Sequence, residues 1–188
     1  YYDVRTFGAV LVGKKGEGYN CGQVRGPVQL TFARSIDPVV PLDLSITRVA
    51  LENSGEETRL NEDEKAATGT MGRKTLVSYG LYRGHGFFTP HFAQDTGCTE
   101  EDLALFWEAL QKMWDLDHSA SRGLMSCRGL YVFSHEKSVG NAPAHKLFEC
   151  ASVKKNEGVE APRKFEDYTI KVDNENLPAG VTLTYLIG

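Results

Sequence analysis

The sequence lacks the features that mark metal centres, disulfide frameworks and membrane proteins. Its four cysteines lie far apart, and no C-x-x-C pair occurs, at Cys21, Cys98, Cys127 and Cys150. We therefore expect idle or buried thiols in a reducing compartment, not a zinc or redox site. No apolar run approaches the roughly 20 residues that cross a bilayer, and no signal-peptide pattern opens the sequence. These absences predict a cytoplasmic protein without a metal, a cofactor or a membrane partner.

Basic residues do not outnumber acidic ones in this sequence. The chain has 21 Lys and Arg against 25 Asp and Glu, a net charge of −4. Residues 52–64 hold six carboxylates and one arginine, so this segment carries −5 and the remainder +1. Because charges are screened beyond about 8 Å at physiological salt, a basic groove can coexist with an acidic segment elsewhere. We interpret residues 52–64 as a solvated loop, with contact to a basic patch on a neighbouring subunit as the sharper hypothesis.

Residues 71–86 contain three permanent cations and no carboxylate. Apolar and small residues alternate through this stretch, which is typical of a strand, and its glycines allow another backbone to approach closely. Residues 23–35 have the same character. Adjacent cations beside a strand suit an extended polyanion better than a small metabolite, so these two segments point to nucleic acid.

Periodicity predicts strands and a few helices. Residues 3–12 fit a short helix or a strand, and the pattern does not decide between them. Alternation predicts a half-buried strand at 28–33 whose polar face carries Gln29, Thr31 and Ser35. Further strands are expected at 44–49, 76–82, 130–135, 168–172 and 181–187, with a helix at 144–153 and a turn-rich connection at 174–180. Segregated strands and helices indicate an α+β fold with a mainly antiparallel sheet.

A longer helix is predicted to begin after Thr99. Its hydroxyl can cap the first amides, and three carboxylates follow where the helix dipole favours negative charge. The next apolar residues recur at helical spacing and predict one face that packs in the core. They are Leu103, Phe106, Trp107, Leu110, Met113 and Trp114.

Several long motifs resemble one known family. They are Asp3–Val10, Gly22–Gln29, Ala33–Ser35, Met71–Lys74 and Tyr79–Tyr82. In these motifs the chain resembles the CRISPR-associated backbone subunit of Cascade, closest to its type I-C branch in the RAMP superfamily, over nearly its whole length. The family carries a substantial N-terminal portion before the Asp3–Val10 motif, so the resemblance implies that the sequence starts inside a longer protein.

The resemblance implies a modified RNA-recognition-motif (ferredoxin-like) fold, in which residues 1–188 form one domain and residues 39–75 a protruding thumb hairpin. It further implies a non-catalytic subunit that stacks head to tail with copies of itself along a CRISPR guide RNA. The guide is then displayed for pairing with a target DNA strand in antiviral defence, and other Cascade subunits complete the complex.

A protein in this role must hold RNA regardless of its sequence, so phosphate and sugar contacts are expected. Arginine suits phosphate because its rigid fork donates two parallel hydrogen bonds. A wedge between nucleotides should be apolar and adaptable, which fits Met71. The candidate RNA-binding residues are Arg25, Gln29, Arg34, Ser35, Arg48, Met71, Arg73 and Lys74. Each cation could instead be a solvated charge or part of a structural ion pair, and Met71 could belong to the core.

Two other functions remain open. One is a RAMP-type CRISPR RNA-processing endoribonuclease, because metal-free RNA cleavage needs an acid and a base, and His85 lies near Lys74 and Tyr82 in the sequence. The Gly84–Gly86 stretch could equally be a turn in which the histidine tolerates unusual backbone angles. The other is a protein-only scaffold whose basic strands meet an acidic partner.

Overall fold

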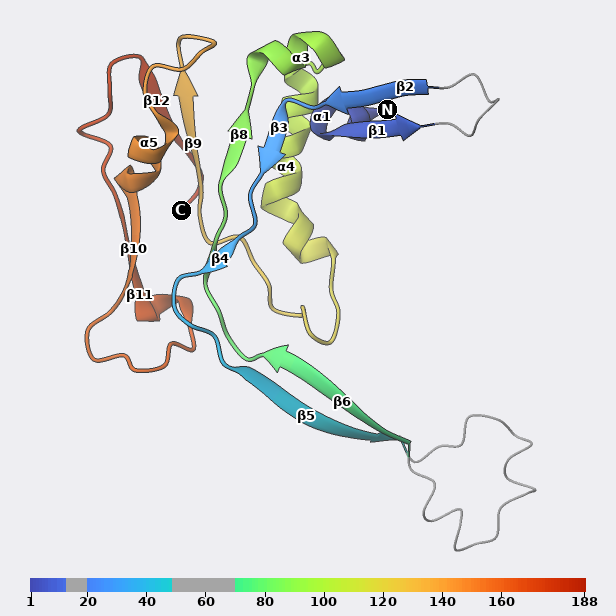
Figure 1. Cartoon of the computed structure of the whole chain (residues 1–188). Helices are drawn as coiled ribbons and strands as arrows, with labels where there is room; N and C mark the ends of the chain where they lie inside the picture. The colour runs from blue at the N-terminus through green and yellow to red at the C-terminus, as the bar shows by residue number, and fades with distance from the viewer. Residues whose placement is uncertain (13–19, 49–69) are drawn as a thin grey trace, which may run out of the picture.

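The structure, a computed structural model, describes residues 1–12, 20–48 and 70–188 (Figure 1). Its helices are α1 (Tyr2–Phe7), α3 (Pro90–Thr96), α4 (Glu100–Leu116) and α5 (Ala144–Cys150), with a 3₁₀ turn at Phe165–Asp167. Its strands are β1 (Gly8–Val12), β2 (Asn20–Arg25), β3 (Val28–Leu30), β4 (Arg34–Ser35), β5 (Pro41–Arg48), β6 (Thr70–Val77), β7 (Tyr82–Arg83), β8 (Gly86–Phe88), β9 (Leu130–His135), β10 (Ala151–Lys155), β11 (Tyr168–Val172) and β12 (Val181–Ile187).

All strand pairs in the described part of the chain are antiparallel, and the predicted α+β class is confirmed. The strands form six two-stranded pairs within these residues instead of one continuous sheet. The RNA-recognition-motif arrangement and the division into one domain with a thumb therefore stay predictions.

The N-terminal segment that fitted either a helix or a strand contains both. Helix α1 ends at Phe7, and β1 begins at once at Gly8, whose φ of +80° turns the chain. A Cβ atom on Gly8 would lie 2.3 Å from the carbonyl oxygen of Val24, and one on Gly26 would lie 2.2 Å from the backbone of Phe7. Two glycines are thus required where the end of α1 crosses the end of β2.

Helix α4 begins as the sequence predicts. The Asp102 amide donates to Thr99 Oγ1 at 3.2 Å, and the Thr99 amide donates back to Asp102 Oδ2 at 3.1 Å, which makes a reciprocal capping box. Within the apolar stripe, Phe106 is buried and its ring meets that of Phe7 edge-on at 5.8 Å. Most of the other stripe residues are half-buried and Met113 is exposed, so the core face is narrower than predicted.

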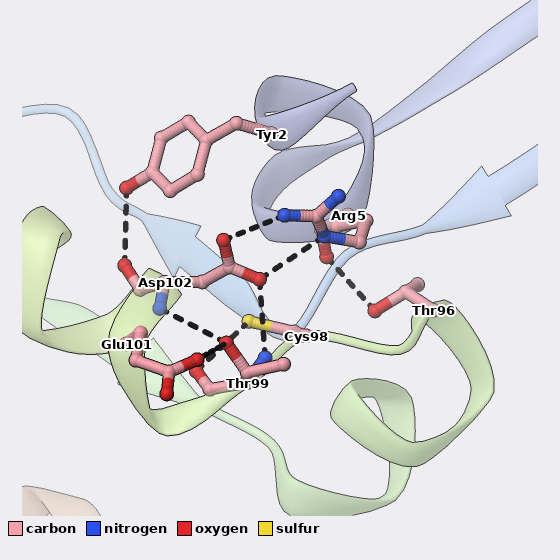
Figure 2. A network of polar contacts seen from close by, with 7 residues as sticks. All are labelled: Tyr2, Arg5, Thr96, Cys98, Thr99, Glu101 and Asp102. Carbon is pink, nitrogen blue, oxygen red and sulfur yellow. Dashed lines mark hydrogen bonds and ion pairs between the residues drawn. The ribbon is translucent and has the colours of Figure 1, made fainter.

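An arginine joins this cap to α1 (Figure 2). Arg5 donates from Nε to Asp102 Oδ2 at 3.0 Å and from Nη2 to Asp102 Oδ1 at 2.7 Å. The Tyr2 hydroxyl donates to the backbone oxygen of Asp102, and Thr96 Oγ1 donates to the backbone oxygen of Arg5. Because Asp102 is only 7% exposed, the bidentate pair holds α1 and α4 in a fixed orientation.

A long two-stranded ribbon leaves this region, and its outer part is the protruding hairpin β5–β6 (Figure 1). Its outgoing arm is residues 28–48 and its return arm residues 70–88, paired successively as β3–β8, β4–β7 and β5–β6. Leu30 pairs with Gly86, Arg34 with Arg83, and Pro41 with Val77. The outgoing arm therefore holds one extra residue before β4 and another between β4 and β5. We call these places the first and second register shifts. After each shift, the side chains of the outgoing arm lie on the face opposite to the one that simple alternation along the sequence predicts.

The first register shift corrects the predicted strand at 28–33. Strand β3 ends at Leu30, and only Val28 is buried, whereas Leu30 and Phe32 are exposed. The predicted return strand at 76–82 is likewise split, because β6 ends at Val77 and β7 begins at Tyr82. The pairing of β5 with β6 follows the expected hairpin, while the acidic residues 52–64 lie outside the described residues.

The C-terminal half contains two further pairs, β9–β12 and β10–β11. The strands predicted at 130–135, 168–172 and 181–187 are confirmed. The helix predicted at 144–153 is too long, because α5 ends at Cys150 and β10 begins at Ala151. Pairing with β11 places Ala151 opposite Val172 and Val153 opposite Ile170, and this contact favours a strand over continued helix.

Candidate nucleic-acid interface

The candidate RNA-binding residues lie along β2 and the ribbon. Arg25 ends β2 and Gln29 lies in β3; both line an open hollow of about 530 Å³, together with Phe7 and Phe92. Arg25 is exposed, whereas the Gln29 side chain donates to the Gly26 carbonyl at 3.0 Å. The structure thus brings these two residues to one concave surface, with Gln29 partly engaged by the backbone.

Arg34 and Ser35 lie on opposite faces of the ribbon. Arg34 pairs with Arg83, and Ser35 pairs with Tyr82. Directly paired residues of an antiparallel ladder share a face, and neighbours along a strand do not. The prediction that Ser35 shares a polar face with Gln29 and Thr31 is therefore wrong, because the first register shift places Arg34 on that face.

Contacts with α5 identify the face that Arg34 shares. Arg83 donates from Nη2 to the Phe148 carbonyl, the His85 ring stacks on Phe148 at 4.2 Å, and the Phe87 ring meets Phe148 edge-on at 5.6 Å. Arg83, His85 and Phe87 therefore all point toward the last turn of α5. Arg34, across from Arg83, is exposed, and among the described side chains it makes no hydrogen bond or ion pair. Arg83 stands in the acid-free stretch of residues 71–86, yet it was not among the RNA-binding residues predicted from the sequence.

The β5–β6 hairpin has one polar and one apolar face. Cross-strand pairing puts Arg73 opposite Ser45 and Thr75 opposite Asp43, and the Thr75 hydroxyl donates to Asp43. The other face carries Leu42, Leu44, Ile46 and Leu76, with Lys74 among them. Although Arg73 and Lys74 are adjacent in the sequence, alternation directs them to opposite faces, and their roles in RNA binding stay predictions.

Arg48 and Met71 occupy the outer end of the hairpin. Thr47 pairs with Met71 and Arg48 with Thr70, so both backbones belong to the ladder. The side chains of Arg48 and Met71 lie outside what the structure describes, and their predicted roles stay predictions.

The two tyrosines near the ribbon's middle differ in burial. Tyr79 is half-buried with its ring stacked on that of Tyr168 at 6.5 Å, whereas Tyr82 is 50% exposed. Tyr79 therefore packs inward, whereas Tyr82 lies at the surface.

The arrangement around His85 does not favour acid–base catalysis. Burial, and secondly the positive charge of Arg83, lower the pKa of His85, and its buried Nε2 has no hydrogen-bond partner among the described residues. Tyr82 pairs with Ser35 on the face opposite to that of Arg83 and His85. His85 has no positive φ, so the interpretation as a turn with unusual backbone angles is wrong.

Among the described residues, other possible functional features would be metal-ligating clusters, cysteines and long apolar helices. No group of three or more His, Cys, Asp or Glu in residues 1–12, 20–48 and 70–188 is placed to hold a metal ion, and Cys98, Cys127 and Cys150 are free thiols. None of the helices in these ranges combines the length and the apolar character that spanning a membrane requires.

Comparison with known proteins gives a family. None of the curated proteins matches the chain. The profile of the family described as CRISPR-associated protein Cas7 matches residues 1–173, which is most of the 188 residues. The match includes α1, the whole ribbon with its cations, and the strands up to β11. The chain therefore belongs to the CRISPR-associated protein Cas7 family.

Proposed function

We propose that this protein is the non-catalytic backbone subunit of a type I-C Cascade, which binds CRISPR guide RNA and displays it for pairing with target DNA. In this proposal copies of the chain assemble in the cytoplasm head to tail along the guide, and other Cascade subunits bind the resulting filament. The observation that carries the proposal is the family match across residues 1–173, which includes the cation-bearing ribbon.

The charges of β2 and of the ribbon support RNA binding through phosphate. Arg25, Arg34 and Arg73 are exposed, and among the described residues no carboxylate forms an ion pair with them. Phosphate contacts by such side chains do not depend on the base sequence, which is what a guide-carrying subunit needs. Ser35 and Gln29 add neutral polar groups, Arg48 and Lys74 further cations, and Met71 a wedge near the tip of the hairpin.

The apolar face of the hairpin supports contact between subunits. Leu42, Leu44 and Ile46 are 41–50% exposed on one face of β5, and phosphate contacts do not use apolar side chains. A head-to-tail contact joins two different surfaces and so generates an open filament instead of a closed dimer. Many weak contacts along one guide then add up to tight binding.

The testing experiment measures binding of the full-length protein to unrelated guide-length RNAs across a salt series, with electron microscopy of the product. We expect sequence-independent binding, a steep salt dependence and helical particles. Absence of binding at low salt would contradict the RNA-binding role and favour the protein-only scaffold.

Two variants sharpen this experiment because Arg73 and Lys74 lie on opposite faces of β6. We expect Arg73→Gln to reduce the slope of log K against log salt by about 0.7, the value for one phosphate contact to a single strand. Lys74→Gln should change the slope less, because Lys74 lies among apolar residues. Equal reductions in the two variants would contradict the assignment of the polar face to RNA.

A further inference from the structure

The base of the projecting hairpin meets the β10–β11 pair through four side chains, which we call the hairpin clamp. Asp37 and Tyr79 come from the two arms of the ribbon, Lys155 ends β10 and Tyr168 begins β11. The Tyr79 and Tyr168 rings stack with their centroids 6.5 Å apart and their planes at 26°. Asp37 Oδ1 lies 3.8 Å from Lys155 Nζ.

The clamp spans the second register shift. Hydrogen bonding joins Ile36 to Leu81, and the next paired residues outward are Pro41 and Val77. The backbone ladder is interrupted between these pairs, so it does not fix the direction in which β5–β6 leaves the rest of the molecule. Asp37 and Tyr79 lie within this interruption, one on each arm, and both contact β10–β11.

The clamp is buried on its Tyr168 side, next to the Asp37 carboxyl. Tyr168 is 8% exposed; burial and then the Asp37 carboxyl raise the pKa of its phenol to about 12. Asp37 Oδ2 is buried and has no hydrogen-bond partner among the described residues. A buried carboxylate oxygen is costly to desolvate, so its presence at a joint indicates a role other than stabilising the core.

We propose that the hairpin clamp sets the direction of β5–β6 and so aligns its Arg73 face with RNA held by the rest of the ribbon. Asp37 and Tyr168 are positioning residues that act through Arg73 without touching RNA. The alignment rests on the proposed RNA-binding function, whereas the mechanical role of the clamp does not.

The first measurement is hydrogen exchange of the full chain with Tyr168→Phe, which keeps the ring stack and removes the hydroxyl. We expect faster exchange of the hydrogen-bonded amides that flank the interruption, at Ile36 and in the first pairs of β5 with β6, with unchanged protection in α4 and in the pair formed by β9 and β12. The matched control is Tyr185→Phe, because Tyr185 lies in β12 and packs on Tyr131 away from the clamp. Unchanged exchange at the joint, or equal loss of protection throughout the chain, would overturn the clamp.

The second measurement is binding of poly(U) RNA across a salt series. Misalignment of the hairpin should reduce the salt slope of Tyr168→Phe by about 0.7 for each phosphate that the variant no longer binds. Adding Arg73→Gln to Tyr168→Phe should then change the slope little, since the two residues act on the same phosphate. A purely structural role for Tyr168 would lower Tm while leaving the slope and the effect of Arg73→Gln intact, which would overturn the alignment.

The two measurements separate the two proposals. Failure of the unsubstituted protein to bind poly(U) contradicts the proposed function, and the exchange data then still decide the mechanical role of the clamp. Lys155→Gln provides a milder variant, since it removes only the partly exposed side of the clamp. It should loosen the same residues to a smaller extent, and an effect elsewhere would count against the clamp.

Discussion

The arginine of α1, Arg5, and the arginine of β4, Arg34, differ in their partners: a carboxylate for the first and another arginine for the second. Two nitrogens of the Arg5 guanidinium are taken up by Asp102 in a bidentate pair between α1 and α4. Arg34 is exposed and stands across the ladder from a second cation, Arg83, which donates to the end of α5. Arg5, paired with a carboxylate, fixes two helices. Arg34, which lies opposite another arginine, keeps its N–H donors available for an anionic ligand. The partner of an arginine, more than its presence, indicates whether it serves the fold or a ligand.

The largest effect is expected where the arginine pair is structural. Asp102→Asn removes the charge that both oxygens of Asp102 present to Arg5 and weakens the cap of α4, so Tm should fall clearly. RNA affinity, measured well below Tm, should stay unchanged. Asp115→Asn, on the same helix and exposed, is the control. A fall in RNA affinity with unchanged stability would assign Asp102 to the interface.

The same pair predicts an acid transition. The hydrogen bonds from Arg5, followed by that from the Thr99 amide, lower the pKa of Asp102 from 3.8 to about 2. A carboxyl whose pKa is lower in the folded state stabilises the fold above its unfolded pKa, and this contribution disappears as pH falls toward the folded pKa. The unsubstituted protein should therefore lose stability between pH 3.8 and about 2, and Asp102→Asn should show a smaller decrease over this range.

An intermediate effect is expected at Arg34. Arg34→Gln should lower the salt slope of RNA binding by about 0.7. It should leave Tm unchanged or raise it slightly, because like charges directly opposite each other destabilise a ladder. Lys137→Gln, an exposed cation beyond β9, is the control. A fall in Tm with an unchanged salt slope would contradict the contrast with Arg5 and would make Arg34 a structural residue.

The smallest effect is expected at His85. His85→Phe keeps a ring against Phe148, and the lowered pKa of His85 makes the imidazole neutral at neutral pH, so the charge of the site hardly changes. RNA affinity should stay nearly the same, and neither protein should cleave precursor RNA. Cleavage by the unsubstituted protein that His85→Phe abolishes would establish the endoribonuclease instead.

Local signals in the sequence predicted local structure well. Thr99 and Asp102 lie three residues apart, so the start of α4 needs no distant partner. The terminal strand at 181–187 is confirmed for a similar reason, because apolar and polar residues alternate from Val181 to Thr184. Such elements follow from neighbouring residues alone.

Features that depend on distant contacts were missed. Alternation continues through Leu30 and Phe32, and nothing in the sequence marks the first register shift, which arises from pairing with residues 83–86. The end of α5 at Cys150 likewise depends on the pairing of β10 with β11. The face of Ser35 was mispredicted and Arg83 was overlooked for the same reason, since the face of each follows from the ladder.

The register shifts also constrain how this chain can change length. Both extra residues lie in the outgoing arm, and a strand repeats every two residues. Deleting one residue within β5 would shift its register and turn over the outgoing arm beyond that point, whereas deleting one between Thr31 and Arg34 would remove the first register shift and leave Arg34 opposite Arg83. In related sequences we therefore expect single-residue length changes in this arm to fall at the register shifts, and changes within the paired strands to come in even numbers or to be matched in the return arm. Related sequences should therefore share the number of residues between paired positions of the two arms more closely than the residues themselves.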